Sequence, residues 1–269
     1  MIASPMIVGR LAPTPSGHLH LGNALAFGAA WLSTRAAGGR VLLRIEDIDR
    51  GRARSDVAAA QRDDLRWLGI DWDEEVAPQS QRSYSVFGAP VYFCDCNRSA
   101  RLTGSCRCRD AGKTAGAVRF RTPPGLVGFV DRALGTQSLA PCDDPVLLGA
   151  DGNPMYALAV VTDDARDGVT EVVRGSDLLD ATPAQIRLCE ALGVPVPTYL
   201  HTPILLGPDG KKLSKSHGST ELRALRAAGF TPAGVWARLL RLLGLPESLE
   251  AARAAFDPAR IPRGPFTIE

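Results

Sequence analysis

A polar turn ahead of an alanine-rich segment combines residue types that suit phosphate binding. Residues 10–23 read RLAPTPSGHLHLGN, and His20 and Asn23 fall where the apolar segment begins. From Gly22 this segment predicts a helix that ends at Gly38-Gly39. The first N–H groups of a helix have no partner within it and lie at its positive dipole end, so they favour a phosphate group.

Four cysteines form a second group of chemical interest. Cys94 and Cys96 make one C-x-C pair, and Cys106 and Cys108 make another. Two close pairs separated by a polar loop suit one structural zinc ion held by four thiolates, although four reduced cysteines without metal are the alternative. The negative charge of such a centre would be offset by nearby arginines, for which the segment offers Arg98, Arg101, Arg107 and Arg109.

The elements around these residues predict an α/β fold. Apolar strands are expected at 7–11 and 41–45, on either side of the helix, and strand–helix–strand is the unit of a parallel nucleotide-binding sheet. A helix is expected over 55–68. The second half of the sheet is expected to begin near Met155, with strands at 169–173 and 199–206.

Shorter elements complete the prediction. Three short strands are expected between the two halves, at 118–121, 128–131 and 146–148. Ser176 or Thr182 is expected to cap a helix, and Pro232 to begin a late helix after Thr231. That late helix carries an apolar stripe expected in the core: Trp236, Leu239, Leu240 and Leu243.

Charge and composition exclude some classes of protein. The 269 residues suffice for one or two domains, and the net charge of +2 gives no global basic field for nucleic acid. Residues 201–269 carry ten bases and six acids, which suits an RNA backbone or simply solvated helix faces. The sequence has no signal-peptide pattern and no apolar run of the ~20 residues that a membrane span needs. We therefore expect a cytoplasmic protein whose six cysteines are thiols or metal ligands.

Three segments resemble the class I aminoacyl-tRNA synthetases. SGHLHLGN at 16–23 resembles their HIGH motif, RIEDID at 44–49 the segment that marks the glutamyl and glutaminyl branch, and KKLSKS at 211–216 their KMSKS loop. Alone, the lysine-rich loop would be read as a solvated surface. The resemblance implies a Rossmann-type parallel sheet with an inserted zinc-binding segment. It implies four parts: sheet halves at 1–82 and 150–218, an acceptor-end-like insertion at 83–149, and a helical part at 219–269.

The same resemblance implies an enzyme that activates L-glutamate with ATP and Mg²⁺. Glu46 would bind the substrate ammonium, with pairing to Arg44 as its structural alternative. The other residues implied for glutamate are Arg10, Leu11, Ala12, Pro13, Thr14, Tyr156 and Arg174. His20 and Lys215 are implied in catalysis. The ATP site would comprise His20, Gly22, Asn23, Lys212 and Lys215.

The length of chain after the lysine loop indicates which molecule receives the glutamyl group. About fifty residues follow it, too few for an anticodon-binding part. The chain thus resembles the stand-alone glutamyl-queuosine branch, which transfers glutamate to the queuosine base at the wobble position of tRNA(Asp). Cys94, Cys96 and Cys108 match its zinc segment, with Cys106 as a substitute ligand. A monomer is expected. The alternatives are a minimal glutamyl-tRNA synthetase charging a tRNA 3′ end, an adenylate-forming ligase with a small-molecule acceptor, and a non-catalytic RNA-binding paralogue.

Overall fold

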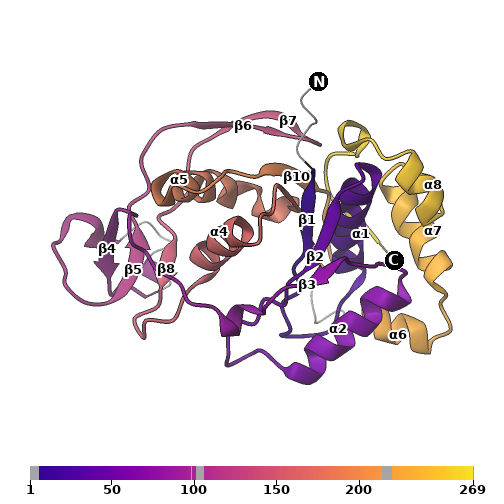
Figure 1. The fold of residues 1–269 in the computed structure, drawn as a ribbon, viewed down its shortest axis with the longest axis horizontal. Coiled ribbons are helices and arrows are strands. Elements are labelled where there is room, and N and C mark those ends of the chain that lie inside the picture. Colours follow the sequence, from indigo (N-terminus) through magenta and orange to yellow (C-terminus); the bar gives the residue numbers. More distant parts are fainter. Residues whose placement is uncertain (1–5, 98, 101–105, 214–219, 269) are drawn as a thin grey trace.

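The first half of the chain builds three parallel strands around one long helix. The computed structural model describes residues 6–97, 99–100, 106–213 and 220–268. Strand β1 pairs with β2, and β2 pairs with β3, all in parallel. Helix α1 connects β1 to β2 and packs on both, as the predicted βαβ unit requires (Figure 1). The bounds are β1 Val8–Leu11, α1 Leu21–Ala36, β2 Arg40–Leu43 and β3 Glu74–Glu75.

The second half continues the same layer. Strands β9 (Glu171–Gly175) and β10 (Thr198–Thr202) are parallel, and β6 (Val127–Asp131) adds to β10 and forms a hairpin with β7 (Gly135–Leu139). The two halves adjoin because β9 lies beside β1, where the N–H of Thr170 donates to the carbonyl oxygen of Val8 at 2.9 Å. The carboxyl ends of β1 and β9 therefore meet at one edge of the layer.

Helices cover both faces of this layer (Figure 1). Helices α4 and α5 lie on one face, and α1 with the C-terminal helices lies on the other. Helix α7 packs closely on α1 at Gly28. A Cβ atom at this position would lie only 2.5 Å from the ring of Trp236, so the close approach requires glycine. The bounds are α2 Ser55–Trp67, α4 Tyr156–Arg166, α5 Thr182–Leu192, α6 Leu222–Ala227, α7 Pro232–Leu242 and α8 Leu249–Ala254.

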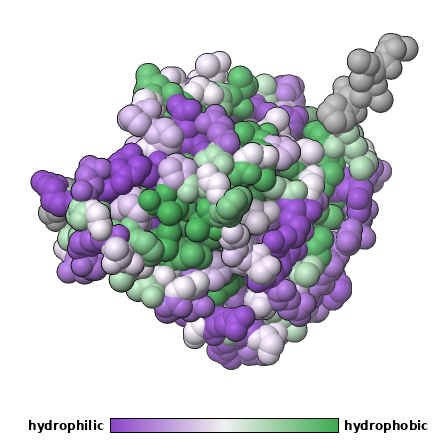
Figure 2. All heavy atoms as spheres, turned by 60° about the vertical axis from the view of Figure 1, so that its left-hand side comes forward, coloured by the Kyte–Doolittle hydropathy of each residue, from purple (hydrophilic) through white to green (hydrophobic). Residues whose placement is uncertain are grey.

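A separate antiparallel sheet carries the cysteine segment. Strands β4 (Val91–Cys94), β5 (Ala117–Phe120) and β8 (Val146–Leu148) form it, at the left of Figure 1. When this side is turned forward, apolar surface gathers near the centre of the face and hydrophilic side chains surround it (Figure 2). No helix in the described ranges is both long and apolar enough to cross a membrane.

Most of the predicted elements are confirmed, with three corrections. The second half of the sheet opens with helix α4 rather than a strand. The predicted strand at 199–206 breaks at Pro203 into β10 and β11 (Leu205–Leu206), and β11 pairs with β12 (Phe266–Thr267). Neither Ser176 nor Thr182 caps α5, which begins after the 3-10 turn η3 (Ser176–Ala181). The late helix is confirmed, with Thr231 as its N-cap and its predicted stripe buried.

Candidate active site

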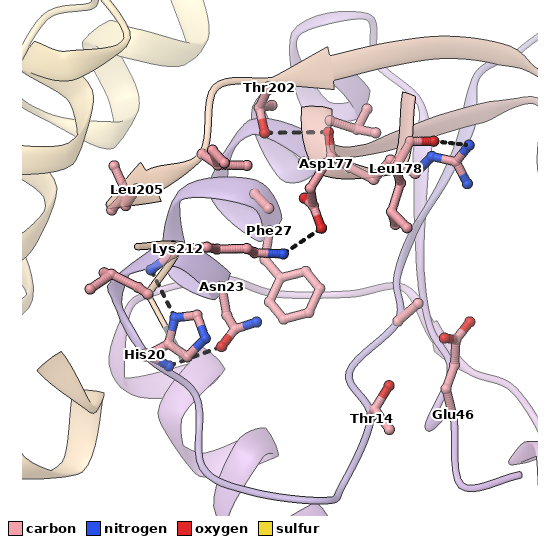
Figure 3. A pocket seen from close by; sticks show the side chains of 18 of the residues that line it. Thr14, His20, Asn23, Phe27, Glu46, Asp177, Leu178, Thr202, Leu205 and Lys212 are labelled. Carbon is pink, nitrogen blue, oxygen red and sulfur yellow. Dashed lines mark hydrogen bonds and ion pairs between the residues drawn. The ribbon is translucent and has the colours of Figure 1, made fainter. Parts of the chain in front are cut away.

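A cavity of about 740 Å³ opens at the edge where β1 and β9 end (Figure 3). Ligands of open α/β sheets bind at such an edge, beyond the carboxyl ends of adjoining strands. The cavity gathers side chains and backbone from both halves of the chain. Ten residues that the sequence singled out line it: Arg10, Ala12, Thr14, His20, Gly22, Asn23, Glu46, Tyr156, Arg174 and Lys212.

Of the residues predicted to bind glutamate or ATP that the structure describes, two do not line the cavity. Leu11 is fully buried in the core, and its carbonyl oxygen accepts from the N–H of Arg44 at 2.9 Å. Pro13 is also buried, and its carbonyl oxygen accepts from the N–H of Glu46 at 3.0 Å. Both therefore hold the backbone of the site. Lys215 lies outside the described residues.

His20 fixes the start of α1 at the cavity. Its Nδ1 accepts from the N–H of Gly22 at 3.1 Å, and the side-chain oxygen of Asn23 accepts from the N–H of His20 at 3.0 Å. This reciprocal pair is a capping box built from histidine and asparagine. Because Nδ1 accepts, a neutral ring carries its proton on Nε2, where it can be donated to an oxygen ligand. The helix start that the sequence predicted is thus formed, and it lies at the cavity.

Sequence reasoning missed several residues of the cavity wall. Asp177, in the turn after β9, forms an ion pair with Lys212 (Figure 3). Phe27 from α1 and Arg52 from the loop after β2 also line the cavity. No sequence signal pointed to Asp177, since its place opposite the lysine loop depends on the return of β10 beside β9.

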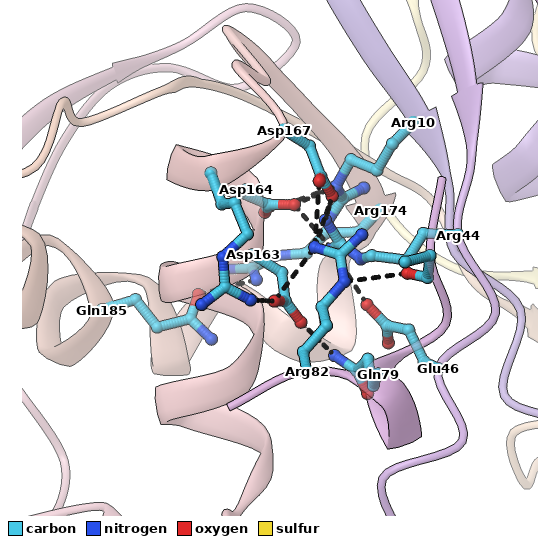
Figure 4. Close-up of polar contacts among 12 residues, drawn as sticks. Arg10, Arg44, Glu46, Gln79, Arg82, Asp163, Asp164, Asp167, Arg174 and Gln185 are labelled. Atoms are coloured by element: carbon cyan, nitrogen blue, oxygen red, sulfur yellow. Dashed lines mark hydrogen bonds and ion pairs between the residues drawn. The ribbon is translucent and has the colours of Figure 1, made fainter. Parts of the chain in front are cut away.

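Two buried arginines and two carboxylates form a network at the opposite end of the cavity, where Arg10 and Glu46 line it and Arg44 and Asp164 lie behind them (Figure 4). Arg10 donates from Nε to Asp164 at 3.3 Å and from a terminal nitrogen to the carbonyl oxygen of Val173 at 3.2 Å. Arg44 donates to Asp164 at 2.6 Å and to Glu46 at 3.1 Å. Burial would raise the pKa of Asp164, but Arg10 and Arg44 outweigh it and hold this pKa below its usual value.

Glu46 is both a structural partner and a cavity residue. It is 8% exposed, pairs with Arg44 and lines the cavity. Burial raises its pKa, while Arg44 and then Arg10 act to lower it. A carboxylate held in this place can receive a ligand cation such as an ammonium group, because its two oxygens have capacity for more donors than Arg44 supplies.

Further ion pairs fix the wall that carries these groups. Arg44 also reaches Asp167 at 2.9 Å, and Arg82 bonds to Asp163 at 3.1 Å and to Asp167 at 2.9 Å (Figure 4). Asp163, Asp164 and Asp167 lie on α4 or just after it, whereas the arginines belong to the first half of the chain. The network thus joins the two halves directly behind the cavity.

The four cysteines come together as predicted. Their sulfur atoms all lie within 4.8 Å of one another, with Cys94 and Cys106 at 3.8 Å and Cys96 and Cys108 at 3.4 Å. Zinc–sulfur bonds of about 2.3 Å in a tetrahedron place sulfurs about 3.8 Å apart, so the group fits a zinc ion. The N–H of Cys108 donates to Cys106 and lowers the pKa of that thiol, whereas hydrogen bonds to Cys108 and Cys106 raise the pKa of Cys96.

Among the described residues, the arginine nearest the sulfurs is Arg119, which the sequence did not suggest. Arg119, from β5, approaches Cys94 at 4.0 Å and Cys106 at 3.8 Å. Arg109 instead pairs with Asp144 at 2.7 Å, and Arg107 bonds to the carbonyl oxygen of Cys106 at 3.2 Å. The other two arginines, Arg98 and Arg101, lie outside the described residues. The pairing of β4 with β5 brings Arg119 here, which no spacing along the chain reveals.

The fold and the cavity define a class of protein. A parallel sheet with a histidine-capped helix at its carboxyl edge, followed by a lysine loop, is the arrangement of a nucleotide-dependent synthetase. The family model described as tRNA synthetases class I (E and Q), catalytic domain, matches residues 6–87 and 97–258, and the chain belongs to this family.

The most informative relatives narrow the class. The glutamyl-Q tRNA(Asp) synthetase of Symbiobacterium thermophilum is 44% identical, over 98% of this chain and 96% of the relative. The protein of that name from Nitratidesulfovibrio vulgaris is 42% identical, over 89% and 87%. The glutamate–tRNA ligase of N. vulgaris strain DP4 is 39% identical over 95% of this chain but 65% of the ligase.

A solved structure agrees on the fold. The glutamate tRNA ligase from Elizabethkingia meningosepticum superposes with a TM-score of 0.78, covering 98% of this chain and 67% of that protein. The two sequences are 22% identical, so this likeness concerns the fold.

Proposed function

We propose that the protein activates L-glutamate with ATP to give glutamyl-adenylate and transfers the glutamyl group to the queuosine base at the wobble position of tRNA(Asp). The observation that carries the proposal is the 44% identity to a glutamyl-Q tRNA(Asp) synthetase across nearly the whole of both chains. The cavity supports it, because it offers a buried carboxylate and two buried guanidinium groups to one small zwitterionic ligand.

In the first step the α-carboxylate of glutamate attacks the α-phosphate of ATP and pyrophosphate leaves. The enzyme supplies no nucleophile, so its contribution is positioning and stabilisation of charge. Glu46 binds the ammonium group, and Arg10 and Arg174 receive the side-chain carboxylate through paired hydrogen bonds. Thr14 and Ala12 border the substrate, and Tyr156 closes the pocket.

ATP lies at the other end of the cavity. His20 donates from Nε2, and the first N–H groups of α1, near Gly22 and Asn23, receive phosphate oxygens. Lys212 moves from Asp177 to the phosphates, and Lys215 completes the lysine loop in the transition state. Mg²⁺ would accompany ATP as part of the substrate and would offset the negative charge of the phosphates.

In the second step a hydroxyl of the acceptor attacks the carbonyl of the adenylate. The new ester forms, AMP leaves and the hydroxyl proton is lost. The acceptor assignment rests on the relatives, not on a residue of this chain.

We also propose that Cys94, Cys96, Cys106 and Cys108 hold one structural zinc ion. The parts at 1–82, 83–149, 150–218 and 219–269 then serve as sheet halves, insertion and helical part of a cytoplasmic monomer.

Transfer of labelled glutamate tests the proposal. The acceptors are queuosine-containing tRNA(Asp), the same tRNA without queuosine, and tRNA(Glu). Label on the queuosine-containing tRNA alone is the expected result. Label on tRNA(Glu) would identify a translational synthetase, and glutamate-dependent exchange of pyrophosphate into ATP without any labelled tRNA would point to another acceptor. Absence of glutamate-dependent pyrophosphate exchange would refute the proposed activation of glutamate.

The zinc proposal has its own test. The protein should contain one zinc per chain by elemental analysis after exhaustive dialysis. In the double variant Cys94→Ser/Cys96→Ser the zinc should be lost, because two ligands cannot retain it. One zinc per chain in that variant would refute the site. The variant Cys142→Ser is the control, since that exposed cysteine lies outside the cluster.

A further inference from the structure

We propose that Asp131 and His201 form a relay that sets the orientation of Arg174, and that this relay determines selectivity for the substrate side chain. The inference rests on the glutamate pocket proposed above. Both residues are positioning residues, since neither lines the cavity. Asp131 ends β6 in the insertion, whereas His201 belongs to β10 of the sheet.

Arg174 is held on every side except toward the cavity. Its Nε donates to Nε2 of His201 at 3.1 Å. One terminal nitrogen donates to the side-chain oxygen of Gln185 at 2.7 Å, and the other to the hydroxyl of Thr182 at 2.8 Å and to the carbonyl oxygen of Leu178 at 3.4 Å. The guanidinium also lies over the ring of Tyr199, 5.4 Å from its centroid. These contacts fix the plane of the guanidinium group and engage four of its five N–H groups, so the direction of the remaining N–H depends on that plane.

The proton of His201 has one place that satisfies both neighbours. Arg174 can only donate, so Nε2 of His201 must accept and the ring proton must be on Nδ1. Nδ1 lies 2.6 Å from Oδ2 of Asp131, which accepts that proton as a hydrogen bond. Burial and the neighbouring Arg174 lower the pKa of His201, and Asp131 acts in the opposite direction. Because the pKa is lowered overall, the ring is neutral.

The carboxylate of Asp131 is itself oriented by the backbone. Its Oδ1 accepts from the N–H groups of Ala133 at 3.0 Å and Leu134 at 2.9 Å. The N–H of His201 also donates to Asp131, at 3.1 Å to Oδ2. Both Asp131 and His201 are at most 1% exposed, so water does not replace these bonds. The relay therefore runs from the insertion into the substrate pocket.

The relay acts on the side chain of the substrate. The α-carboxylate must turn toward the triphosphate at His20, which leaves the side-chain carboxylate for the buried arginines. A carboxylate there can accept from Arg174 through one oxygen and from Arg10 through the other, whereas the amide of glutamine accepts through one oxygen only. Selectivity for glutamate over glutamine thus depends on a guanidinium held in one plane.

The substitution Asp131→Asn tests the relay through the tautomer of His201. The two backbone donors keep the amide oxygen at the Oδ1 position, so the amide nitrogen faces Nδ1 of the ring and the backbone N–H of His201. The ring then accepts at Nδ1 and carries its proton on Nε2. Two donors, this Nε2–H and the Nε–H of Arg174, then face each other, and the hydrogen bond between them is lost. The contact with the backbone N–H is the same in a His201→Gln background, so it cancels in a double-variant cycle. We expect the KM for glutamate in pyrophosphate exchange to rise about tenfold, with the KM for ATP unchanged and a smaller preference over glutamine.

A double-variant cycle separates the relay from a structural effect. In His201→Gln the side-chain oxygen can still accept from Arg174 and has no tautomer to reverse, so adding Asp131→Asn in that background should change the KM for glutamate less than about twofold. The variant His201→Leu, which removes the acceptor, should raise it as Asp131→Asn does. Gln137→Ala in the same hairpin is the matched control, because in the described part of the chain this side chain bonds to the backbone of its own turn.

Several outcomes would overturn the relay. The relay is wrong if Asp131→Asn leaves the KM for glutamate within twofold of wild type. It is also wrong if this variant raises both KM values together or has the same effect in the His201→Gln background. Should Asp131→Asn fail to fold by circular dichroism, the comparison of His201→Leu with His201→Gln decides alone. Absence of glutamate-dependent exchange in the wild-type protein would instead refute the proposed function.

Discussion

A terminal nitrogen of Arg44 lies 2.6 Å from Oδ1 of Asp164, deep between the two halves of the chain. The Arg44 side chain is fully buried and that of Asp164 is 7% exposed. Asp164 also receives Arg10 from β1, so one carboxylate compensates two buried cations that lie 34 residues apart in sequence. The amino-acid end of the cavity depends on this compensation, because Arg10 and Glu46 both belong to the same network.

Replacement of this carboxylate should destabilise the fold. In Asp164→Ala the buried charges of Arg10 and Arg44 lose a partner, which costs about 3–5 kcal/mol of unfolding free energy. Urea denaturation followed by circular dichroism measures it. The control is Asp56→Ala, whose exposed pair with Arg54 should contribute nothing measurable. A stability equal to wild type would show that the network is compensated in another way.

The lysine loop should matter for activation but not for folding. Lys215→Ala removes the cation that the KMSKS resemblance assigns to the phosphates in the transition state. Pyrophosphate exchange should fall about 100-fold or more, while the melting temperature stays within error of wild type. Lys211→Ala changes an exposed neighbour in the same run and is the control. Near-normal exchange in Lys215→Ala would remove that role.

Arg119 should slow the release of zinc. Its guanidinium lies 3.8 Å from the sulfur of Cys106 and so offsets the negative charge of the thiolates. In Arg119→Gln, zinc should transfer to a chromogenic chelator about 10-fold faster or more, since outer partners of metal ligands have effects of that order. Arg121→Gln, an arginine that bonds to Asp110 on the same segment, is the control. Equal release rates in both variants would contradict the role of Arg119.

The sequence predicted the local elements and the cavity residues well. His20 and Asn23 lie within one turn of each other, so a single helix start brings them together regardless of the rest of the fold. The four cysteines also lie close in sequence, within residues 94–108, so their grouping could be predicted from spacing alone. These groups are local, and local spacing carries the information that places them.

Contacts between distant segments were not predictable in the same way. The approach of Arg119 to the sulfurs depends on the register of β4 with β5, which pairs Tyr92 with Arg119. The ion pair of Lys212 with Asp177 and the bond of His201 to Asp131 both depend on β10 returning between β9 and β6. Pattern along the chain specifies that strands exist, whereas their order and register decide which polar side chains meet.

Asp64 on α2 should make stability depend on pH. Its side-chain oxygens are buried without a hydrogen-bond partner in the described part of the chain. Burial raises the pKa of its carboxyl to about 6, with Arg223 as the main opposing influence. The folded state therefore binds this proton more tightly than the unfolded state, whose carboxyl has the ordinary pKa of about 3.9. Stability from this group is full below the unfolded pKa and is lost as pH rises through the folded pKa near 6.

The variant Asp64→Asn has no proton to lose at this position. Relative to wild type, its unfolding free energy should increase by about 1–3 kcal/mol between pH 4 and pH 7 and then stay level. Urea denaturation of both proteins at half-unit steps of pH measures the difference, and titrations shared by the two cancel in it. Two stability curves that run parallel from pH 4 to pH 7 would show that the Asp64 carboxyl titrates normally. A difference that grows through this range would show that the fold tolerates an uncompensated buried carboxylate on α2 at neutral pH.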